Sequence, residues 1–263
     1  METIGFPEVK VDNLSCRFGN NEVLHSININ FEKNKFYSIL GPNGSGKTTL
    51  LKKLGKTLES NKKTIFIENK DVIDFKNKAL AKKLAVVPQN TILDFDFSAL
   101  DIVLMGRSPH VSRFQQESKK DYDIAENAMK ITNTWHFRDK YINQLSGGEQ
   151  QRVVIARALA QDTDIILLDE PISHLDIHHQ IEILDTIKSL SKKVTIIAVL
   201  HDLNLAAQYS DYLILVNKGS IAFQGTPEEV LIEENIKKVY DINMCMIKNP
   251  VTGKPYIIPI GSV

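Results

Sequence analysis

Residues 35–58 decide the fold and read KFYSILGPNGSGKTTLLKKLGKTL. Residues 35–40 have the length and composition of a β-strand, and glycines follow at positions 41, 44 and 46. Over residues 49–58 the leucines recur at helical spacing, as they do on one face of a helix. The stretch therefore predicts a strand, a glycine-rich loop and a helix in direct succession.

The loop matches the pattern G-x-x-x-x-G-K-[ST] in the strand-to-helix setting that this pattern requires. In such a loop, backbone amides and the helix start point at phosphate oxygens. Lys47 supplies a fixed positive charge, and the Thr48 hydroxyl is placed to hold Mg²⁺. An ordinary glycine turn is the alternative, and the flanking strand and helix disfavour it. We predict that a nucleotide is bound by Gly41, Pro42, Asn43, Gly44, Ser45, Gly46, Lys47, Thr48 and Thr49.

Apolar runs elsewhere indicate an α/β fold. Residues 165–168 and 194–200 are nearly unbroken apolar runs, which are typical of strands buried on both faces of a parallel sheet. Residues 9–18 and 23–31 alternate instead, and predict an antiparallel edge. Residues 99–159 show helical stretches, for example 119–132 with Ile124, Ala128 and Ile131 on one stripe.

We predict one domain over residues 1–263, with a catalytic core at 1–92 and 160–225. Residues 93–159 form a helical subdomain and residues 226–263 a C-terminal extension. A hairpin is expected at 213–223 and a helix from Pro227, where proline and two acids suit a first turn. The tail after Ile242 is short and mixed.

The composition limits the possible partners and compartments. Lysine plus arginine and aspartate plus glutamate both number 32, so the net charge is zero and does not favour nucleic acid. Cys16 and Cys245 lie far apart, which fits a reducing compartment. The first ten residues lack the features of a secretory signal, and no apolar run approaches bilayer-spanning length. We expect a cytosolic protein that associates with any membrane peripherally.

Two acidic residues follow the apolar run at 165–168. Asp169 ends this strand, where a carboxylate can bind Mg²⁺ through water. Glu170 comes next, and we assign it as the base that orients and deprotonates the attacking water. A solvated turn is the alternative, but a buried strand that delivers two carboxylates recurs in nucleotide hydrolases.

Residues 145–152, LSGGEQQR, resemble the signature sequence of ABC ATPases. Ser146 and the amides of Gly147 and Gly148 lead into an apolar helix, a second anion-binding helix start. The resemblance implies a RecA-like phosphate-loop NTPase core with a helical ABC-specific subdomain. It implies ATP as the nucleotide and two copies closed head to tail, in which Ser146, Gly147, Gly148 and Glu149 of one copy contact the γ-phosphate held by the other.

Further residues match the family pattern, and their roles come from the resemblance. Gln89 resembles the glutamine that touches Mg²⁺ and relays the permease's state, and His201 the histidine that senses the γ-phosphate. Residues 173–176 resemble the loop across the dimer interface. Phe18 is expected to stack on adenine, although an aromatic residue at a strand end is more often core. Ile172 stands where the family commonly has threonine, a position not expected to bind nucleotide.

Three stretches narrow the resemblance to importers of ferric siderophores, haem and cobalamin: VLMGRSPH at 103–110, HDLNLAA at 201–207 and NPVTGKP at 249–255. The resemblance implies a peripheral ATPase on the cytoplasmic face, beside permease subunits and, indirectly, an extracytoplasmic substrate-binding protein. We expect ferric siderophores as cargo, with haem or cobalamin as alternatives. A soluble ABC ATPase without a permease is the alternative of another class, but it usually carries two motor halves or a long coiled-coil insertion.

Overall fold

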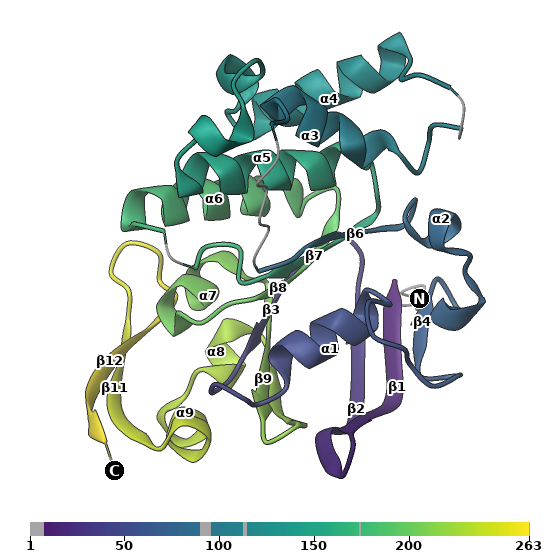
Figure 1. Cartoon of the computed structure of the whole chain (residues 1–263). Helices are drawn as coiled ribbons and strands as arrows, with labels where there is room; N and C mark the ends of the chain where they lie inside the picture. The colour runs from purple at the N-terminus through teal and green to yellow at the C-terminus, as the bar shows by residue number, and fades with distance from the viewer. Residues whose placement is uncertain (1–7, 90–95, 113–114, 174, 263) are drawn as a thin grey trace, which may run out of the picture. The chain divides into compact units, whose positions relative to one another are not determined.

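The computed structural model describes residues 8–89, 96–112, 115–173 and 175–262 (Figure 1). The chain divides into two compact units. The first comprises residues 1–75 with 191–263, and the second comprises residues 76–190. None of the helices within the described ranges is both long enough and apolar enough to cross a membrane.

The first unit contains the predicted antiparallel edge. Its sheet has the order β2-β1-β4-β5, with bounds β1 Val9–Phe18, β2 Asn21–Phe31, β4 Ile65–Ile67 and β5 Lys70–Asp71. Apolar side chains of β1 alternate into the core, among them Val9, Val11 and Cys16. The alternation read from the sequence is therefore confirmed, and β2 begins two residues earlier than expected.

Strand β3 (Phe36–Leu40) is central in the first unit because it pairs in parallel on both sides. Its neighbours are β8 (Thr195–Val199) and β9 (Tyr212–Asn217), and β9 pairs antiparallel with β10 (Ser220–Gly225). All five residues of β3 are buried. The strand leads through the glycine loop into α1 (Lys47–Leu54), which ends before the predicted Leu58, with Gly55 as the C-cap and Lys56 after it at a positive φ of 55°.

Three further helices and a hairpin complete the first unit. The helices are α7 (Leu203–Tyr209), α8 (Pro227–Val230) and α9 (Glu233–Tyr240), with a 3₁₀ turn η1 at Val72–Asp74. Residues 242–262, read as a mixed tail, form the hairpin β11 (Ile242–Lys248) and β12 (Pro255–Ser262). Asn204 of α7 fixes this hairpin, because its amide donates to the carbonyl of Ile257 at 3.1 Å and accepts from the Ile257 N–H at 2.7 Å.

The second unit pairs β6 (Leu84–Val87) in parallel with β7 (Ile165–Asp169). Its helices are α2 Asn77–Leu80, α3 Ala99–Leu104, α4 Lys119–Ile131, α5 Gly147–Ala160 and α6 Ile177–Leu190, with 3₁₀ turns η2 Met105–Arg107, η3 Trp135–Phe137 and η4 Ile142–Gln144. Helices α3, α4 and α5 share one apolar cluster. All five helices fall in one unit with β6 and β7. The limits of the helical subdomain at residues 93 and 159 stay a prediction.

The buried face of α4 differs from the predicted stripe. Ala125, Ala128 and Met129 are buried with Asp121, whereas Ile131 is 43% exposed. The contacts with α3 and α5 select the face that carries Asp121, because its carboxylate meets a buried arginine there. Of the predicted stripe, Ala128 is buried and Ile124 packs partly buried against the same cluster, so only the prediction for Ile131 was wrong.

Arg107 explains that choice of face. Its Nε donates to Asp121 Oδ1 at 2.9 Å and its Nη1 to the carbonyl of Ala160 at 2.7 Å, where α5 ends. A cation at a helix C-terminus is favourable. Gly106 approaches the same helix so closely that a methyl group on it would lie 2.2 Å from the Arg157 carbonyl oxygen. The residues around position 107, read as a family marker, thus have a packing role.

We expect Asp121→Asn to lower the free energy of unfolding by about 3–5 kcal/mol at pH 7, because it leaves a buried guanidinium without its anion. Hydrogen bonds from the Ser118 hydroxyl and from Arg107 lower the pKa of Asp121 to about 2. This contribution is complete above the unfolded pKa of about 3.9 and is lost as the pH falls toward 2.

Urea unfolding of both proteins from pH 7 to pH 2 measures this effect, and the difference between them is expected to shrink in acid. Lys130→Ala removes the exposed ion pair with Glu126 on the same helix and serves as the control. Its effect is expected to stay below about 1 kcal/mol. Equal, small effects of both substitutions would show that the Arg107–Asp121 ion pair does not stabilise the fold.

Candidate active site

The glycine loop presses against neighbouring strands of the first unit. A methyl group on Gly41 would lie 2.1 Å from the Val216 carbonyl oxygen, and one on Gly46 would lie 2.8 Å from Leu24 Cδ2. Both glycines have positive φ angles, 148° and 105°. Gly44 also has a positive φ, but no described atom lies within 4 Å of a methyl group built there. Close approach of the Val216 backbone therefore requires glycine at position 41, whereas a methyl group on Gly46 would meet the Leu24 side chain and lie 3.0 Å from the Val23 carbonyl oxygen.

Two backbone hydrogen bonds hold the loop from outside. The N–H of Gly219, in the turn between β9 and β10, donates to the Ser45 carbonyl at 3.0 Å. The N–H of His25 on β2 donates in turn to the Gly219 carbonyl at 2.8 Å. The loop is thus shaped by segments about 20 residues before it and about 170 residues after it in the chain.

The donors inside the loop fit an anion. Lys47 is 6% exposed, and its Nζ donates to the carbonyls of Gly41 and Pro42 at 2.8 and 2.9 Å. The Oγ of Ser45 is buried and has no hydrogen-bond partner among the described residues. Such a buried polar atom needs a partner, and phosphate oxygens supply one. Thr48 and Thr49 follow in the first turn of α1, both half-buried.

The second unit brings Gln89 and Glu170 together. Both residues follow the ends of the parallel strands β6 and β7. Gln89 Nε2 donates to Glu170 Oε2 at 2.6 Å, and the Ser173 hydroxyl donates to the Glu170 carbonyl at 2.9 Å. Glu170 has a φ of 51°, a backbone conformation that is uncommon for residues other than glycine and that often marks functional sites. Asp169, the last residue of β7, is 4% exposed.

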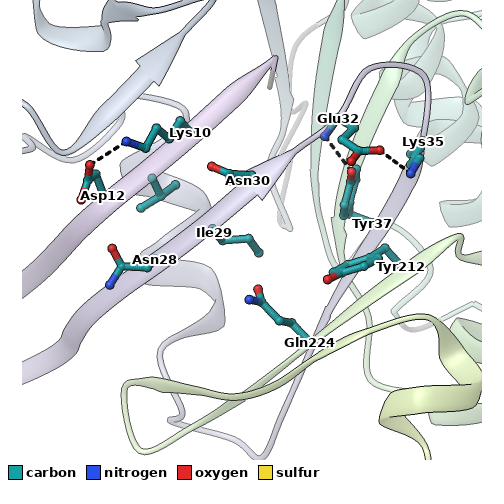
Figure 2. A pocket seen from close by; sticks show the side chains of 11 residues that line it. Lys10, Asp12, Asn28, Ile29, Asn30, Glu32, Lys35, Tyr37, Tyr212 and Gln224 are labelled. Carbon is teal, nitrogen blue, oxygen red and sulfur yellow. Dashed lines mark hydrogen bonds and ion pairs between the residues drawn. The ribbon is translucent and has the colours of Figure 1, made fainter. Parts of the chain in front are cut away.

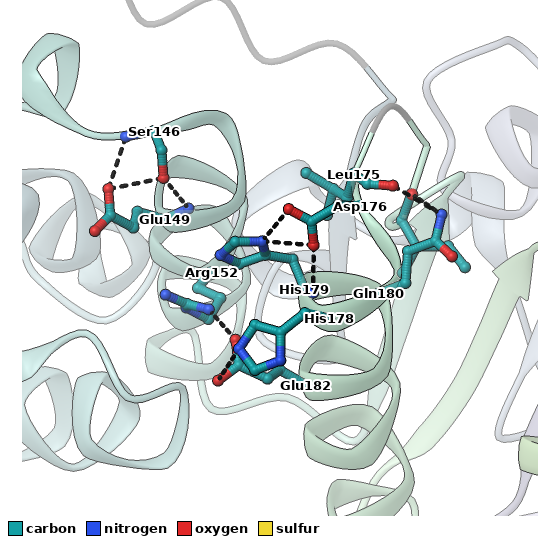
Figure 3. A network of polar contacts seen from close by, with 10 residues as sticks. Ser146, Glu149, Arg152, Leu175, Asp176, His178, His179, Gln180 and Glu182 are labelled. Atoms are coloured by element: carbon teal, nitrogen blue, oxygen red, sulfur yellow. Dashed lines mark hydrogen bonds and ion pairs between the residues drawn. The ribbon is translucent and has the colours of Figure 1, made fainter.

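The predicted signature forms the start of α5. Ser146 is the N-cap and completes a capping box with Glu149, whose carboxylate accepts from the Ser146 N–H at 2.7 Å and from its hydroxyl at 2.8 Å (Figure 3). These hydrogen bonds, the backbone one foremost, lower the pKa of Glu149. Ser146 and Gly147 are exposed, whereas Gly148 is buried. The helix start that is predicted to bind an anion is therefore open to solvent at Ser146 and Gly147.

The remaining predicted residues are placed as follows. Phe18 ends β1 and is 50% exposed, so it is not a core residue. His201 is exposed two residues after β8. The loop, Phe18 and His201 belong to the first unit, and Gln89, Asp169, Glu170 and residues 146–149 to the second. The proposed Mg²⁺ ligands Thr48, Gln89 and Asp169 are divided between the units, and His174 lies outside the described residues.

A cavity of about 450 Å³ lies elsewhere in the first unit (Figure 2). It is lined by residues of β1, β2, β3, β9 and β10 and of the β2–β3 turn. Its charges compensate one another, since Lys10 lies 2.8 Å from Asp12 and Lys35 contacts Glu32. The hydroxyl of Tyr37 already accepts from the Glu32 N–H at 2.7 Å. This balance gives no attraction to a triphosphate, so the glycine loop is the better nucleotide site.

Sequence reasoning missed the contacts between α5 and α6. The ring of His179 lies against Gly148 and beside Asp176, and Arg152 donates to Glu182 (Figure 3). Asp176 and His179 are three residues apart, a spacing at which an aspartate caps a helix start, so this part had a local signal. The contacts of His179 and Glu182 with α5 join residues distant in the chain, so no local sequence pattern could have predicted them.

Comparison with known proteins identifies the family. Residues 24–173 match the ABC transporter family profile. An uncharacterized ABC transporter ATP-binding protein of Methanocaldococcus jannaschii is 40% identical, covering 96% of this chain and 98% of its own. The ferric enterobactin transport ATP-binding protein of Escherichia coli is 34% identical over 95% and 93%. A probable siderophore transport system ATP-binding protein of Bacillus subtilis is 36% identical over 98% and 94%.

Solved structures agree with the sequence comparison. A metal-chelate type ABC transporter in an inward-facing conformation superposes with a TM-score of 0.83 at 28% identity, covering 96% of this chain and 97% of the other. A dimeric ATP-binding cassette in a post-hydrolysis state with ADP and phosphate gives 0.72 at 30% identity, covering 83% and 98%. With a matching profile, full-length relatives and a phosphate-loop fold, this chain belongs to the ATP-binding, ATP-hydrolysing subunits of the ABC transporter family.

Proposed function

We propose that this chain powers the import of ferric siderophores, as a pair of identical subunits beside a membrane permease. The observation that carries this proposal is the near full-length similarity to ATP-binding proteins named for ferric enterobactin and siderophore transport. The cargo does not contact this subunit. A separate substrate-binding protein delivers it, and the permease passes it through the membrane.

Glu170 is the proposed base of ATP hydrolysis. Its carboxylate accepts the proton of the attacking water, and Gln89 orients the carboxylate by donating to Oε2. The positive φ of Glu170 supports this role, because strained backbone is retained where the reaction needs a particular side-chain direction. His201, at the end of the β8 segment, is proposed to contact the γ-phosphate.

Lys47 and the loop amides are the proposed phosphate ligands. In the described structure the ammonium group of Lys47 is held by two loop carbonyls, so it is already directed over the loop. The buried Oγ of Ser45, for which the described residues offer no hydrogen-bond partner, supports a phosphate there. Mg²⁺, when bound, neutralises developing phosphate charge, and the oxygen donors that we propose for it are Thr48, Gln89 and Asp169. Phe18, exposed at the end of β1, is the proposed adenine contact.

The exposed start of α5 supports action as a pair. Ser146 and Gly147 present an anion-binding helix start on the surface. A head-to-tail pair places the signature of each copy on the γ-phosphate held by the other, which a twofold axis allows. The dimeric post-hydrolysis relative supports this assembly.

Uptake of labelled iron tests the proposal. Cells lacking the gene are supplied with single siderophores, haem or cobalamin, and complemented with the wild type, Lys47→Ala or Lys52→Ala. Lys52 is exposed on the same helix and serves as the matched control. We expect cells without the gene to lose uptake of a ferric siderophore. The wild type and Lys52→Ala should restore this uptake, and Lys47→Ala should not. Loss of uptake confined to haem or cobalamin would show that this compound is the cargo in place of a ferric siderophore. Unchanged uptake of every compound would contradict the importer role.

A further inference from the structure

The first turn of α6 lies against the first turn of α5 (Figure 3). The imidazole of His179 covers Gly148. A methyl group on Gly148 would lie 2.8 Å from His179 Cδ2 and 3.0 Å from Cγ. Real side-chain carbons do not approach so closely, so the ring occupies the space that any side chain at position 148 would need. Glycine at this position of the signature is therefore matched to histidine at position 179.

His179 also holds the carboxylate of Asp176. Its backbone N–H donates to Oδ1 at 3.0 Å, and its ring Nδ1 lies 2.9 Å from both carboxylate oxygens. An ionised carboxylate can only accept, so Nδ1 carries the proton and donates. The carboxylate fixes the ring plane, while the Asp176 side chain stays 65% exposed. The loop that leads into α6 is thus connected through one ring to the signature turn.

A second contact lies one helical turn further along both helices. Arg152 Nη1 donates to Glu182 Oε2 at 2.5 Å, and the side chain of Arg152 is only 10% exposed. Arg152 follows Gly148 by four residues, and Glu182 follows His179 by three, so the two contacts lie on matching faces. Two contacts one turn apart oppose rotation of one helix start against the other.

We propose that His179 is a positioning residue for ATP hydrolysis, which fixes the signature turn at residues 146–148 and the Asp176 carboxylate in one rigid arrangement. This inference rests on the proposed head-to-tail pair, in which both groups face the other copy. Each copy then delivers its phosphate-binding amides and its interface carboxylate together. Catalysis depends on such placement to within about 1 Å. A loosened His179 contact should therefore slow turnover without altering ATP binding to the phosphate loop of a single chain.

A size exchange between positions 148 and 179 tests this contact. Gly148→Ala keeps the backbone N–H and places a better helix former in α5, so a loss does not come from a weaker helix, and rescue by the double variant assigns it to the clash with the ring. We expect kcat to fall by about ten- to a hundredfold, with the Kd for ATP unchanged. His179→Ala alone is expected to lower kcat less. The double variant should regain at least about fivefold over Gly148→Ala, as residues in direct contact do.

The control and the contrary outcomes are specific. His178→Ala removes the neighbouring ring. This ring is exposed, and its Nε2 lies 3.8 Å from Glu182 Oε1, beyond hydrogen-bond distance, so the substitution should leave kcat unchanged. A fully active Gly148→Ala, or a double variant no faster than it, would overturn the role of His179. The head-to-tail pair of two copies is tested separately with the wild-type protein. Its specific ATPase activity should rise with protein concentration. If it does not rise, the proposed pair fails; if it rises and the exchange gives no rescue, the inference about His179 fails.

Discussion

Glu170→Gln is expected to bind ATP as tightly as the wild type and to hydrolyse it at least about a hundredfold more slowly, the range that general base catalysis contributes. The amide keeps the shape of the carboxylate but cannot take a proton from water. Gln89 can still contact the side chain, so the local geometry at the ends of β6 and β7 should persist. Bound ATP should then hold two copies together, visible as a dimer in size-exclusion chromatography.

The matched control is Asp164→Asn, which exchanges acid for amide at the opposite end of β7. Its carboxylate is 54% exposed and pairs with Lys83 at 3.0 Å, so we expect wild-type hydrolysis. Steady-state phosphate release and equilibrium ATP binding measure both variants. Wild-type turnover by Glu170→Gln would assign the base to another residue, and loss of ATP binding would make the carboxylate a ligand of the nucleotide.

Gly41→Ala is expected to weaken ATP binding at least about a hundredfold, because the added methyl group overlaps a backbone atom that cannot yield. The overlapping atom is the carbonyl oxygen of Val216, 2.1 Å away, and Val216 is fixed in β9 by its pairing with Ile221 of β10. The loop must therefore move instead, and with it the amides that are proposed to bind phosphate. Overpacking of this kind typically costs about 1–3 kcal/mol or more, before the strain of a positive φ is added.

Gly44→Ala separates the two causes. Gly44 has a φ of 75°, but its added methyl group meets no described atom within 4 Å. It carries only the conformational cost of about 1–2 kcal/mol, so ATP affinity should fall by about tenfold. Calorimetric ATP binding and urea unfolding of the two variants measure the difference. Equal losses in both would mean that backbone conformation, and not the approach to β9, decides the loop.

The phosphate loop and the start of α5 were predictable because their signals are local. A glycine loop needs its own glycines and the helix that follows, and the capping box needs only Ser146 and Glu149 three residues apart. Alternation in β1 and nearly unbroken apolar runs in β7 and β8 similarly report which faces are buried. These segments carry in their own residues the reason for their structure.

Other features depended on partners distant in the chain. The buried face of α4 follows Arg107, and the hairpin at 242–262 is fixed by Asn204, which lies 53 residues before its partner Ile257. No periodicity in either segment reveals those partners. Thus the sequence by itself determined the family, the glycine loop between strand and helix, and the acidic strand end. Only the tertiary structure decided which face of α4 is buried, how the tail folds and that His179 covers Gly148, because these depend on packing between segments that no local pattern encodes.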